Sequence, residues 1–295
     1  MSLFGRLEAR TPPMAALVVA VVAVSTSAIL IRLSDAPKGP MAFWRVTFTI
    51  LLLAPLAWRH RTSLAKLQRR DAISAGLAGL ALAAHFVSWF ESVDRTTVAA
   101  SVTLVTTQPA FVAVAAALLL DEPLGRRKAA GIGVALGGAG LMSIGAEQGT
   151  APEPLLGNLL ALTGAVLAAA YVLAGRSVRQ RVAVLPYVTV VYSVCAVTLL
   201  AYVLALGDPL VAYPGHEWLL FLGMALGPGV FGHTVINWAL EHVESSVVSV
   251  SLVGEPVGST ILALLILGEV PVAVTVLGGG VVLTGIYVTS SARRE

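Results

Sequence analysis

Ten apolar segments, each long enough to cross a lipid bilayer as a helix, make up most of this 295-residue chain. A helix needs about 20 residues to span about 30 Å of hydrocarbon. The segments are residues 14–33, 40–58, 72–91, 97–120, 128–146, 155–175, 184–206, 217–240, 246–267 and 270–290. Only 12% of the residues are charged, too few to cover a water-soluble globule of this length. The sequence therefore predicts an all-α integral membrane protein with ten transmembrane helices.

A duplication relates the two halves of the chain. The stretch LLLDEPLGRRKAAGIGVALGGAG at residues 118–140 resembles LILGEVPVAVTVLGGGVVLTG at residues 265–285, at an offset of 147 residues. At the same offset Pro109 corresponds to Pro256. Repeats in so apolar a chain are typical of transporters built from two homologous halves around a central substrate path.

The ten segments divide into five within residues 1–147 and five within residues 155–295, on either side of a polar stretch near residues 148–154. Because five is an odd number, corresponding helices run in opposite directions across the membrane. We therefore expect two inverted five-helix repeats that pack into one compact transmembrane domain. Inversion lets one scaffold adopt inward-open and outward-open states by exchanging the conformations of its halves.

The distribution of basic residues predicts the orientation in the membrane. If the N-terminus is cytoplasmic, 15 of the 19 Lys and Arg residues lie in inner loops or at the termini. These are Arg6, Arg10, Arg59, Arg61, Lys66, Arg69, Arg70, Arg126, Arg127, Lys128, Arg176, Arg179, Arg181, Arg293 and Arg294. Cations near helix ends resist translocation, so both termini are expected in the cytoplasm. We interpret the basic residues as topology signals and expect no nucleic-acid partner.

Polar residues inside the apolar segments are the candidate substrate-binding residues, because a polar side chain at membrane depth is costly. In the third segment His85 and Trp89 lie one helical turn apart on one face. In the eighth segment His233 and Asn237 repeat this spacing, and Trp238 follows. An imidazole can hydrogen-bond a carboxylate, and an indole offers an apolar wall with an N–H donor, which suits an aromatic amino acid. The alternative is that the histidines only bond to neighbouring helices.

Glu255 is the only carboxylate that lies well inside a predicted helix. It is a candidate proton carrier or a partner for a substrate ammonium group. A structural role, bonding to backbone groups freed by Pro256, is equally compatible with its position. Gln108, its counterpart in the first repeat, cannot titrate but can offer the substrate a donor and an acceptor. Tyr171, in the sixth segment, is a further candidate for lining the substrate path.

Prolines and small residues within the segments indicate hinges and close contacts. Pro109, Pro228 and Pro256 are candidate hinges, because a proline inside a span removes a helical hydrogen bond and bends the helix; a static kink is the alternative. Three pairs of glycines have the four-residue spacing that permits close helix contact. These are Gly133 and Gly137, Gly223 and Gly227, and Gly254 and Gly258. We expect them to pack within one chain rather than between chains, and hence a monomer.

Arg45 lies near the outer end of the second segment. One interpretation is a gate that closes the outer side by pairing with Asp35, Glu91 or Asp94. A second is that the side chain snorkels to the membrane interface. We favour these two roles over direct pairing with a substrate carboxylate.

No enzyme motif accompanies these residues. The chain has no HExxH, GxSxG, CxxC or Walker sequence. Its single cysteine, Cys195, excludes an internal disulfide. We therefore expect no catalysis, no cofactor or metal, and no drive by ATP. A non-transporting membrane scaffold is the remaining alternative, although it requires neither inverted repeats nor polar residues at mid-depth.

The paired patterns TTQPAFVAVAAALLLDEP and VGEPVGSTILALLILGEVP, each followed by a glycine-rich helix, resemble the EamA branch of the drug/metabolite transporter superfamily. The resemblance covers nearly the whole chain, and within the superfamily the chain looks most like the YddG-type exporters of aromatic and other neutral amino acids. It implies a multi-pass exporter of small metabolites in the bacterial inner membrane, working without ATP.

Together these observations predict a secondary transporter that exports amino acids by alternating access around a central cavity. The free energy comes from the substrate gradient, or from proton exchange if Glu255 titrates. Transport of drugs, nucleosides or sugars is the alternative, because the motifs of the branch indicate fold more than substrate.

Overall fold

The computed structural model describes residues 12–59, 67–119, 125–147, 151–179, 181–239, 251–252 and 254–291. Within these ranges the regular structure is entirely helical. The helices of the first half are α2 (Pro13–Ser25), α3 (Ser27–Arg32), α4 (Lys38–Arg59), α6 (Arg69–Arg95), α7 (Val98–Val105), α8 (Gln108–Leu119) and α9 (Arg126–Glu147). Those of the second half are α10 (Pro154–Arg179), α11 (Val184–Leu206), α12 (Gly215–Met224), η1 (Ala225–Thr234), α13 (Val235–Ala239), α15 (Gly254–Leu262), η2 (Ala263–Leu267) and α16 (Ala273–Ser291).

Six stretches among the described residues have the length and hydropathy of a membrane span. They are Pro13–Arg32, Lys38–Arg59, Arg69–Arg95, Val98–Ala115, Pro154–Gly175 and Val184–Leu206. Gly254–Leu267 and Ala273–Thr289 are apolar but shorter. Each of the ten predicted segments coincides with a helix or a run of consecutive helices, the ninth segment only from residue 251 onward. The prediction of an all-α membrane protein is therefore confirmed.

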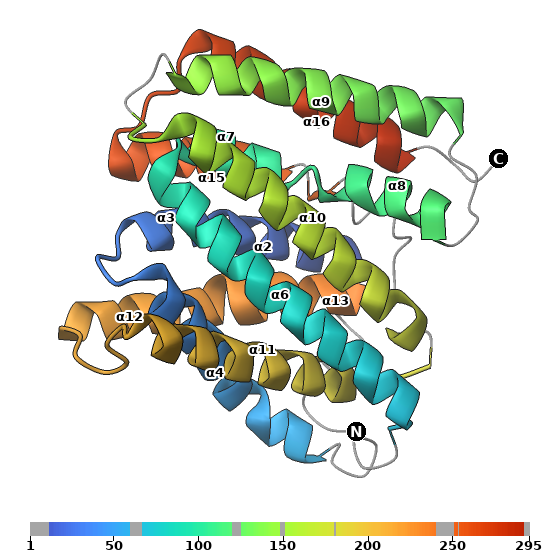
Figure 1. Cartoon of the computed structure of the whole chain (residues 1–295), viewed down its shortest axis with the longest axis vertical. Helices are drawn as coiled ribbons and strands as arrows, with labels where there is room; N and C mark the ends of the chain where they lie inside the picture. Colours follow the sequence, from blue (N-terminus) through green and yellow to red (C-terminus); the bar gives the residue numbers. More distant parts are fainter. Residues whose placement is uncertain are drawn as a thin grey trace.

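The last helices of the two repeats, α9 and α16, pack along each other in an antiparallel pair (Figure 1). Glycine allows the close approach: Gly131 lies against the backbone of Gly285, and Gly138 against that of Gly278. In the duplicated sequence, Gly131 corresponds to Gly278 and Gly138 to Gly285. Exchanging the repeats therefore turns each of these contacts into the other. Such a relation defines a two-fold axis between inverted repeats.

The two repeats interleave instead of forming separate bundles. Helix α10 of the second repeat packs along α6 of the first, and the two run side by side in Figure 1. In the opposite repeats, α2 corresponds to α10 and η1 lies in the span that corresponds to α6. These two helices also pack against each other. Helices α4 and α11 also pack together, and buried residues of α4, α6 and α11 belong to one hydrophobic cluster. One core therefore holds both repeats.

The fourth span is interrupted between α7 and α8. The hydroxyl groups of Thr106 and Thr107 donate to the carbonyl oxygens of Val102 and Leu104, each at 2.6 Å. Pro109 then occupies the first turn of α8, where its missing N–H leaves no helical bond unmade. This proline begins a new helix instead of kinking a continuous one, which corrects the expectation of a mid-helix bend.

The other two candidate hinges also lie at irregular helix geometry. Pro256 stands in the first turn of α15, the position that corresponds to Pro109 in the first repeat. Pro228 is buried inside η1, a π-helical stretch whose wider turns interrupt the α-helix between α12 and α13. All three prolines therefore mark discontinuities of a span, and movement at them stays a prediction.

The glycine pairs differ from one another in their surroundings. Gly227, Gly254 and Gly258 face Thr26, Val21 and Ser25 of the first span, as expected for packing within the chain. Gly133 and Gly137 have no atom within 4 Å of an added Cβ, so their predicted role in packing within the chain is wrong. The glycines that hold α9 against α16 lie on the opposite face of the helix.

We predict that Gly138→Ala destabilises the protein by about 1–3 kcal/mol, because the new Cβ would lie 2.6 Å from Val282 N and 2.8 Å from Gly278 O. Gly137→Ala is the matched control, since it adds the same methyl group on the open face of the same helix. Alanine in a helix should stabilise that variant by up to about 1 kcal/mol. Thermal unfolding of both purified proteins in detergent measures the difference, and equal midpoints would contradict the α9–α16 contact.

Candidate functional site

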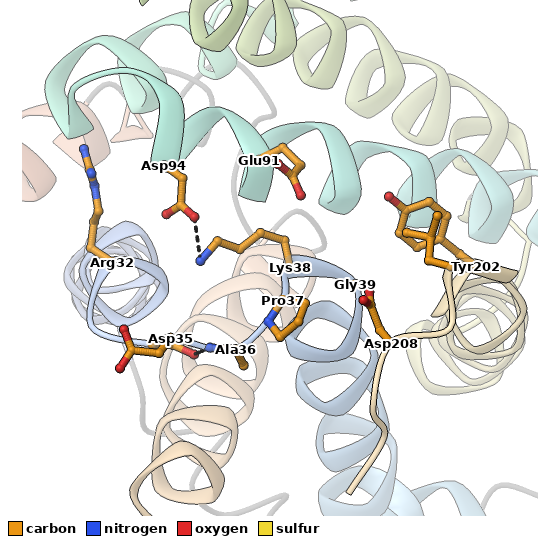
Figure 2. Close-up of a pocket in the computed structure, with 12 residues that line it drawn as sticks. Arg32, Asp35, Ala36, Pro37, Lys38, Gly39, Glu91, Asp94, Tyr202 and Asp208 are labelled. Atoms are coloured by element: carbon orange, nitrogen blue, oxygen red, sulfur yellow. Dashed lines mark hydrogen bonds and ion pairs between the residues drawn. The ribbon is translucent and has the colours of Figure 1, made fainter. Parts of the chain in front are cut away.

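A pocket of about 600 Å³ opens at the end of the bundle where α3, α4, α6 and α11 meet (Figure 2). Its lining is rich in charged side chains. They are Arg32, Asp35, Lys38, Glu91, Asp94 and Asp208. Lys38 Nζ on α4 lies 2.9 Å from Asp94 Oδ2 on α6, and Figure 2 shows its side chain reaching across between the two helices. The charge pattern of the loops predicts that this is the outer end.

Two carboxylates of the second repeat bind the first repeat at this end. Glu217, at the start of α12, is 1% exposed and accepts hydrogen bonds from the hydroxyl of Ser34 and, at 2.8 Å, from the backbone N–H of Asp35. Glu269 accepts from the backbone N–H of Val98 at 2.7 Å and lies 3.6 Å from the Arg32 guanidinium. These bonds tie the ends of α12 and η2 to the first repeat.

Glu269 lies in the loop between η2 and α16. Burial raises the pKa of its carboxyl group above the ordinary value, although Arg32 and the Val98 N–H act in the opposite direction. The ionised form is therefore harder to maintain here than in water, so this link to the first repeat is sensitive to acid on its own side of the membrane.

The opposite end carries a related link. Arg181 Nη2 lies 2.6 Å from Asp71 Oδ1, joining the loop after α10 to the first turn of α6. At the offset of 147 residues Ser34 corresponds to Arg181, and Glu217 corresponds to the neighbour of Asp71. Each end of the protein therefore has a link between repeats in which one partner is at an equivalent position and the other is shifted by one residue.

Arg45 is buried in the centre of the protein, with 2% of its surface exposed. Its guanidinium lies over the ring of Phe86 at 4.6 Å and near that of Phe90 at 5.6 Å, and Nη1 donates to Ser27 Oγ at 3.2 Å. The atom Nη2 is buried and has no hydrogen-bond partner among the residues that the structure describes.

This position corrects the expectation that Arg45 snorkels to the interface. Helix α4 begins at Lys38, seven residues earlier, so Arg45 lies about 10 Å along the helix from its start. Two of the carboxylates expected to pair with Arg45 pair with other cations instead. Asp94 pairs with Lys38, and Glu91 pairs with Arg95. Its predicted pairing in an outer gate is not made in this structure.

His85 and Trp89 lie together on α6, as their spacing predicts. Their rings are nearly parallel, with centroids 6.0 Å apart. His85 Nδ1 lies 2.9 Å from the carbonyl oxygen of Gly164 on α10, so this nitrogen is the N–H donor and neutral His85 offers Nε2 as an acceptor. Trp89 is 4% exposed, and its Nε1 has no hydrogen-bond partner.

Residues of the second repeat complete a central cluster around Arg45. Arg45 lies within electrostatic range of Glu255 and Tyr192, and His233 lies within that range of Arg45 and His85. Glu255 and His233 are half-buried. We define the central cluster as Arg45, His85, Trp89, Tyr192, His233 and Glu255. It brings together four of the predicted site residues and Arg45.

The remaining predicted site residues are placed differently. Tyr171 shares a hydrogen bond with Tyr187 at the edge of the central cluster. Gln108 is half-buried at the start of α8. Trp238 packs with Leu17 in a small cluster apart from the main core, so the structure does not bring it to His85.

Asn237 lies in α13, and its side chain is outside the described residues. Its predicted contact with the substrate stays a prediction.

Sequence reasoning did not place Tyr192 or Ser27 beside Arg45. For Tyr192 a signal was present, because this residue corresponds to Arg45 at the offset of 147 residues. Corresponding residues near a two-fold axis lie near each other. The bond from Ser34 to Glu217 joins a loop residue to a residue at a helix end. Neither hydropathy nor the repeat pattern predicts this bond.

The model of the EamA-like transporter family matches residues 12–144 and again residues 155–291. The chain therefore belongs to the EamA-like transporter family and is a multi-pass membrane transporter of the drug/metabolite type. It is 26% identical over 200 residues to "Uncharacterized transporter YdfC" of Bacillus subtilis (strain 168), a match that covers 67% of this chain and 65% of that protein. A solved crystal structure, described only as that of a protein, is similar with a TM-score of 0.64 and 22% identity, over 94% of this chain and 95% of the other. That likeness supports the fold.

We predict that Glu217→Ala destabilises the protein by about 1–3 kcal/mol, because the Ser34 hydroxyl and the Asp35 N–H lose their acceptor. Leu219→Ala is the control: this side chain lies on the same helix and is 71% exposed, so the change should alter the free energy of unfolding by less than about 0.5 kcal/mol. Thermal unfolding in detergent tests both, and a Glu217→Ala protein as stable as Leu219→Ala would show that the link contributes nothing.

Proposed function

We propose that this protein exports aromatic and other neutral amino acids across the bacterial inner membrane, with both termini in the cytoplasm. The observation that carries the proposal is the central cluster, in which both repeats contribute ionisable and aromatic side chains at membrane depth. Such side chains are rare inside a membrane protein and are found along substrate pathways. Their mixture of charge and apolar surface matches an amphipathic zwitterion.

Each group in the cluster has a role in the proposal. The ring of Trp89, nearly parallel to that of His85, forms a flat wall for an apolar side chain. Glu255 accepts hydrogen bonds from the substrate ammonium group, and His85 Nε2 is a second acceptor. These contacts replace the water that the substrate loses when it enters. No covalent step, cofactor or ATP is involved, and one chain is sufficient.

Transport follows an alternating-access cycle of the two inverted repeats. At the outer end, the bond from Ser34 to Glu217 joins the two repeats, and the ion pair of Lys38 with Asp94 joins α4 to α6 within the first repeat. Together these contacts act as the outer gate. At the inner end, the Arg181–Asp71 pair has the corresponding role. Opening one end while the other closes exposes the central cluster to each side in turn.

Two energy sources are compatible with the cluster. The substrate gradient alone can drive export, because a carrier runs in the direction that its gradients impose. If Glu255 exchanges a proton during the cycle, inward proton flow adds to the driving force. Gln108, the counterpart of Glu255, has no proton to exchange, so one carboxyl group per cycle carries the coupling.

Uptake by purified protein in liposomes tests the substrate class. Labelled amino acids, nucleosides and sugars are offered with and without a pH gradient. We expect saturable uptake of neutral amino acids and competition by aromatic ones. Uptake confined to nucleosides, sugars or drugs would reject the proposed class and leave only the family assignment.

We predict that His85→Ala and Trp89→Ala each lower amino-acid uptake about tenfold or more, because each removes a contact worth about 1–3 kcal/mol to a dehydrated substrate. Trp58 is the matched control in the same chain. Its side chain is 69% exposed, and its replacement by alanine should leave uptake within about twofold. Equal uptake by all three variants would remove His85 and Trp89 from the site.

We predict that Glu255→Gln abolishes the dependence of transport on the pH gradient, because an amide has no proton to exchange. Exchange of labelled for unlabelled substrate without a gradient should continue, since the amide still offers the substrate ammonium group an acceptor oxygen. The ratio of uptake with and without the gradient measures the effect. An unchanged ratio in the variant would assign coupling to another residue or to none.

A further inference from the structure

The guanidinium of Arg45 is a buried cation that contacts no carboxylate among the described residues. It donates to the hydroxyl of Ser27 and lies on the faces of Phe86 and Phe90, while Nη2 has no hydrogen-bond partner in the described part of the chain. Buried charges in proteins are almost always paired with an opposite charge, and a charge buried without one is strongly unfavourable. A permanent cation in this state favours the binding of an anionic group.

Glu255 is within electrostatic range of Arg45, yet these two described side chains form no direct ion pair. One positive and one negative group thus stand apart in the same cluster. An α-amino acid carries the complementary arrangement, a carboxylate and an ammonium group on one carbon atom. Its two charges can satisfy both side chains at once.

His85 cannot replace Arg45 as the partner of a carboxylate. His85 donates its Nδ1–H to the carbonyl oxygen of Gly164, so in the neutral form its other nitrogen is an acceptor and repels a carboxylate. Trp89 differs, because its buried Nε1–H has no partner. Its ring contacts Phe90, with centroids 5.6 Å apart, and the same phenyl ring lies beside Arg45. The two unused donors are therefore close neighbours of one side chain.

The duplication shows that this arrangement departs from the symmetry of the scaffold. Arg45 corresponds to Tyr192 at the offset of 147 residues, and Glu255 corresponds to Gln108. Each charged residue of the cluster thus has an uncharged counterpart in the other repeat. In a fully symmetric protein each charged side chain would occur twice, once in each repeat. A zwitterionic substrate instead needs one cation and one anion from the protein.

We infer that Arg45 binds the carboxylate of the transported substrate, with the Trp89 Nε1–H as a second donor. The inference rests on the proposed amino-acid transport and narrows it: substrates must carry a carboxylate. The corresponding amides, amines, nucleosides and sugars are then poor substrates, whatever their apolar groups.

Competition in liposomes tests the assignment with the full-length protein. Uptake of labelled phenylalanine is measured against unlabelled phenylalanine, phenylalaninamide and phenylethylamine. A charge-assisted hydrogen bond to the carboxylate corresponds to about a 10- to 100-fold difference in affinity, so wild type should prefer phenylalanine to its amide by that factor. In Arg45→Gln this preference should fall to about twofold or less, because the charge that distinguishes acid from amide is gone.

Three further variants separate binding from structure. Arg59→Gln removes an exposed arginine from the end of the same helix and should keep the wild-type preference. Arg45→Lys retains the charge and should keep part of it. Trp89→Phe keeps an aromatic ring but removes the N–H donor, so it should lower the preference less than Arg45→Gln does.

The outcomes distinguish this inference from the function on which it rests. If wild type transports no amino acid, the proposed function fails. If wild type transports phenylalanine and Arg45→Gln keeps the full preference for acid over amide, the Arg45 assignment alone fails. Should the Arg45 variants not fold, thermal stabilisation of wild type by phenylalanine, phenylpropionate and phenylalaninamide decides. Equal stabilisation by the acid and the amide overturns the inference.

Discussion

The absence of water from the hydrocarbon core is the constraint on which this structure depends, because every polar group there must find its partner in the protein. The interrupted fourth span meets this requirement through hydroxyl groups of Thr106 and Thr107, which bond back to the preceding helical turn. Six buried side-chain polar atoms of the described residues have no hydrogen-bond partner, and two of them, Arg45 Nη2 and Trp89 Nε1, belong to the central cluster. In the proposed function, the substrate supplies the acceptors for these two donors.

The fold was largely predictable because its signals are local. The length of an apolar segment and the offset between repeats are read directly from the sequence. The packing face of a helix is harder to predict. Glycine spacing shows where a helix can be approached closely, but α9 has several glycines on different faces. Gly131 and Gly138 contact α16, whereas Gly133 and Gly137 face away from the rest of the described chain. The interleaving of the repeats likewise follows from three-dimensional contacts that no single segment encodes.

The candidate site was predictable where residue type and depth coincide. His85, His233 and Glu255 are polar residues deep inside apolar segments, and the structure places them in one cluster with Arg45. Arg45 itself was assigned to the periphery because α4 starts before hydropathy rises, at Lys38, a buried residue paired with Asp94. The link from Ser34 to Glu217 joins residues 183 positions apart and depends on how the repeats dock, which sequence patterns do not report.

Symmetry and chemistry make opposite demands on a carrier of this design. Alternating access benefits from repeats that are interchangeable, and the glycine contacts of α9 with α16 preserve that equivalence. A substrate with two unlike ends requires repeats that differ where they touch it. The repeats differ at the charged residues of the central cluster: Arg45 corresponds to Tyr192, and Glu255 corresponds to Gln108. In the proposed function, divergence at these positions is what lets an inverted scaffold hold a zwitterion in one orientation while its helices exchange conformations around it.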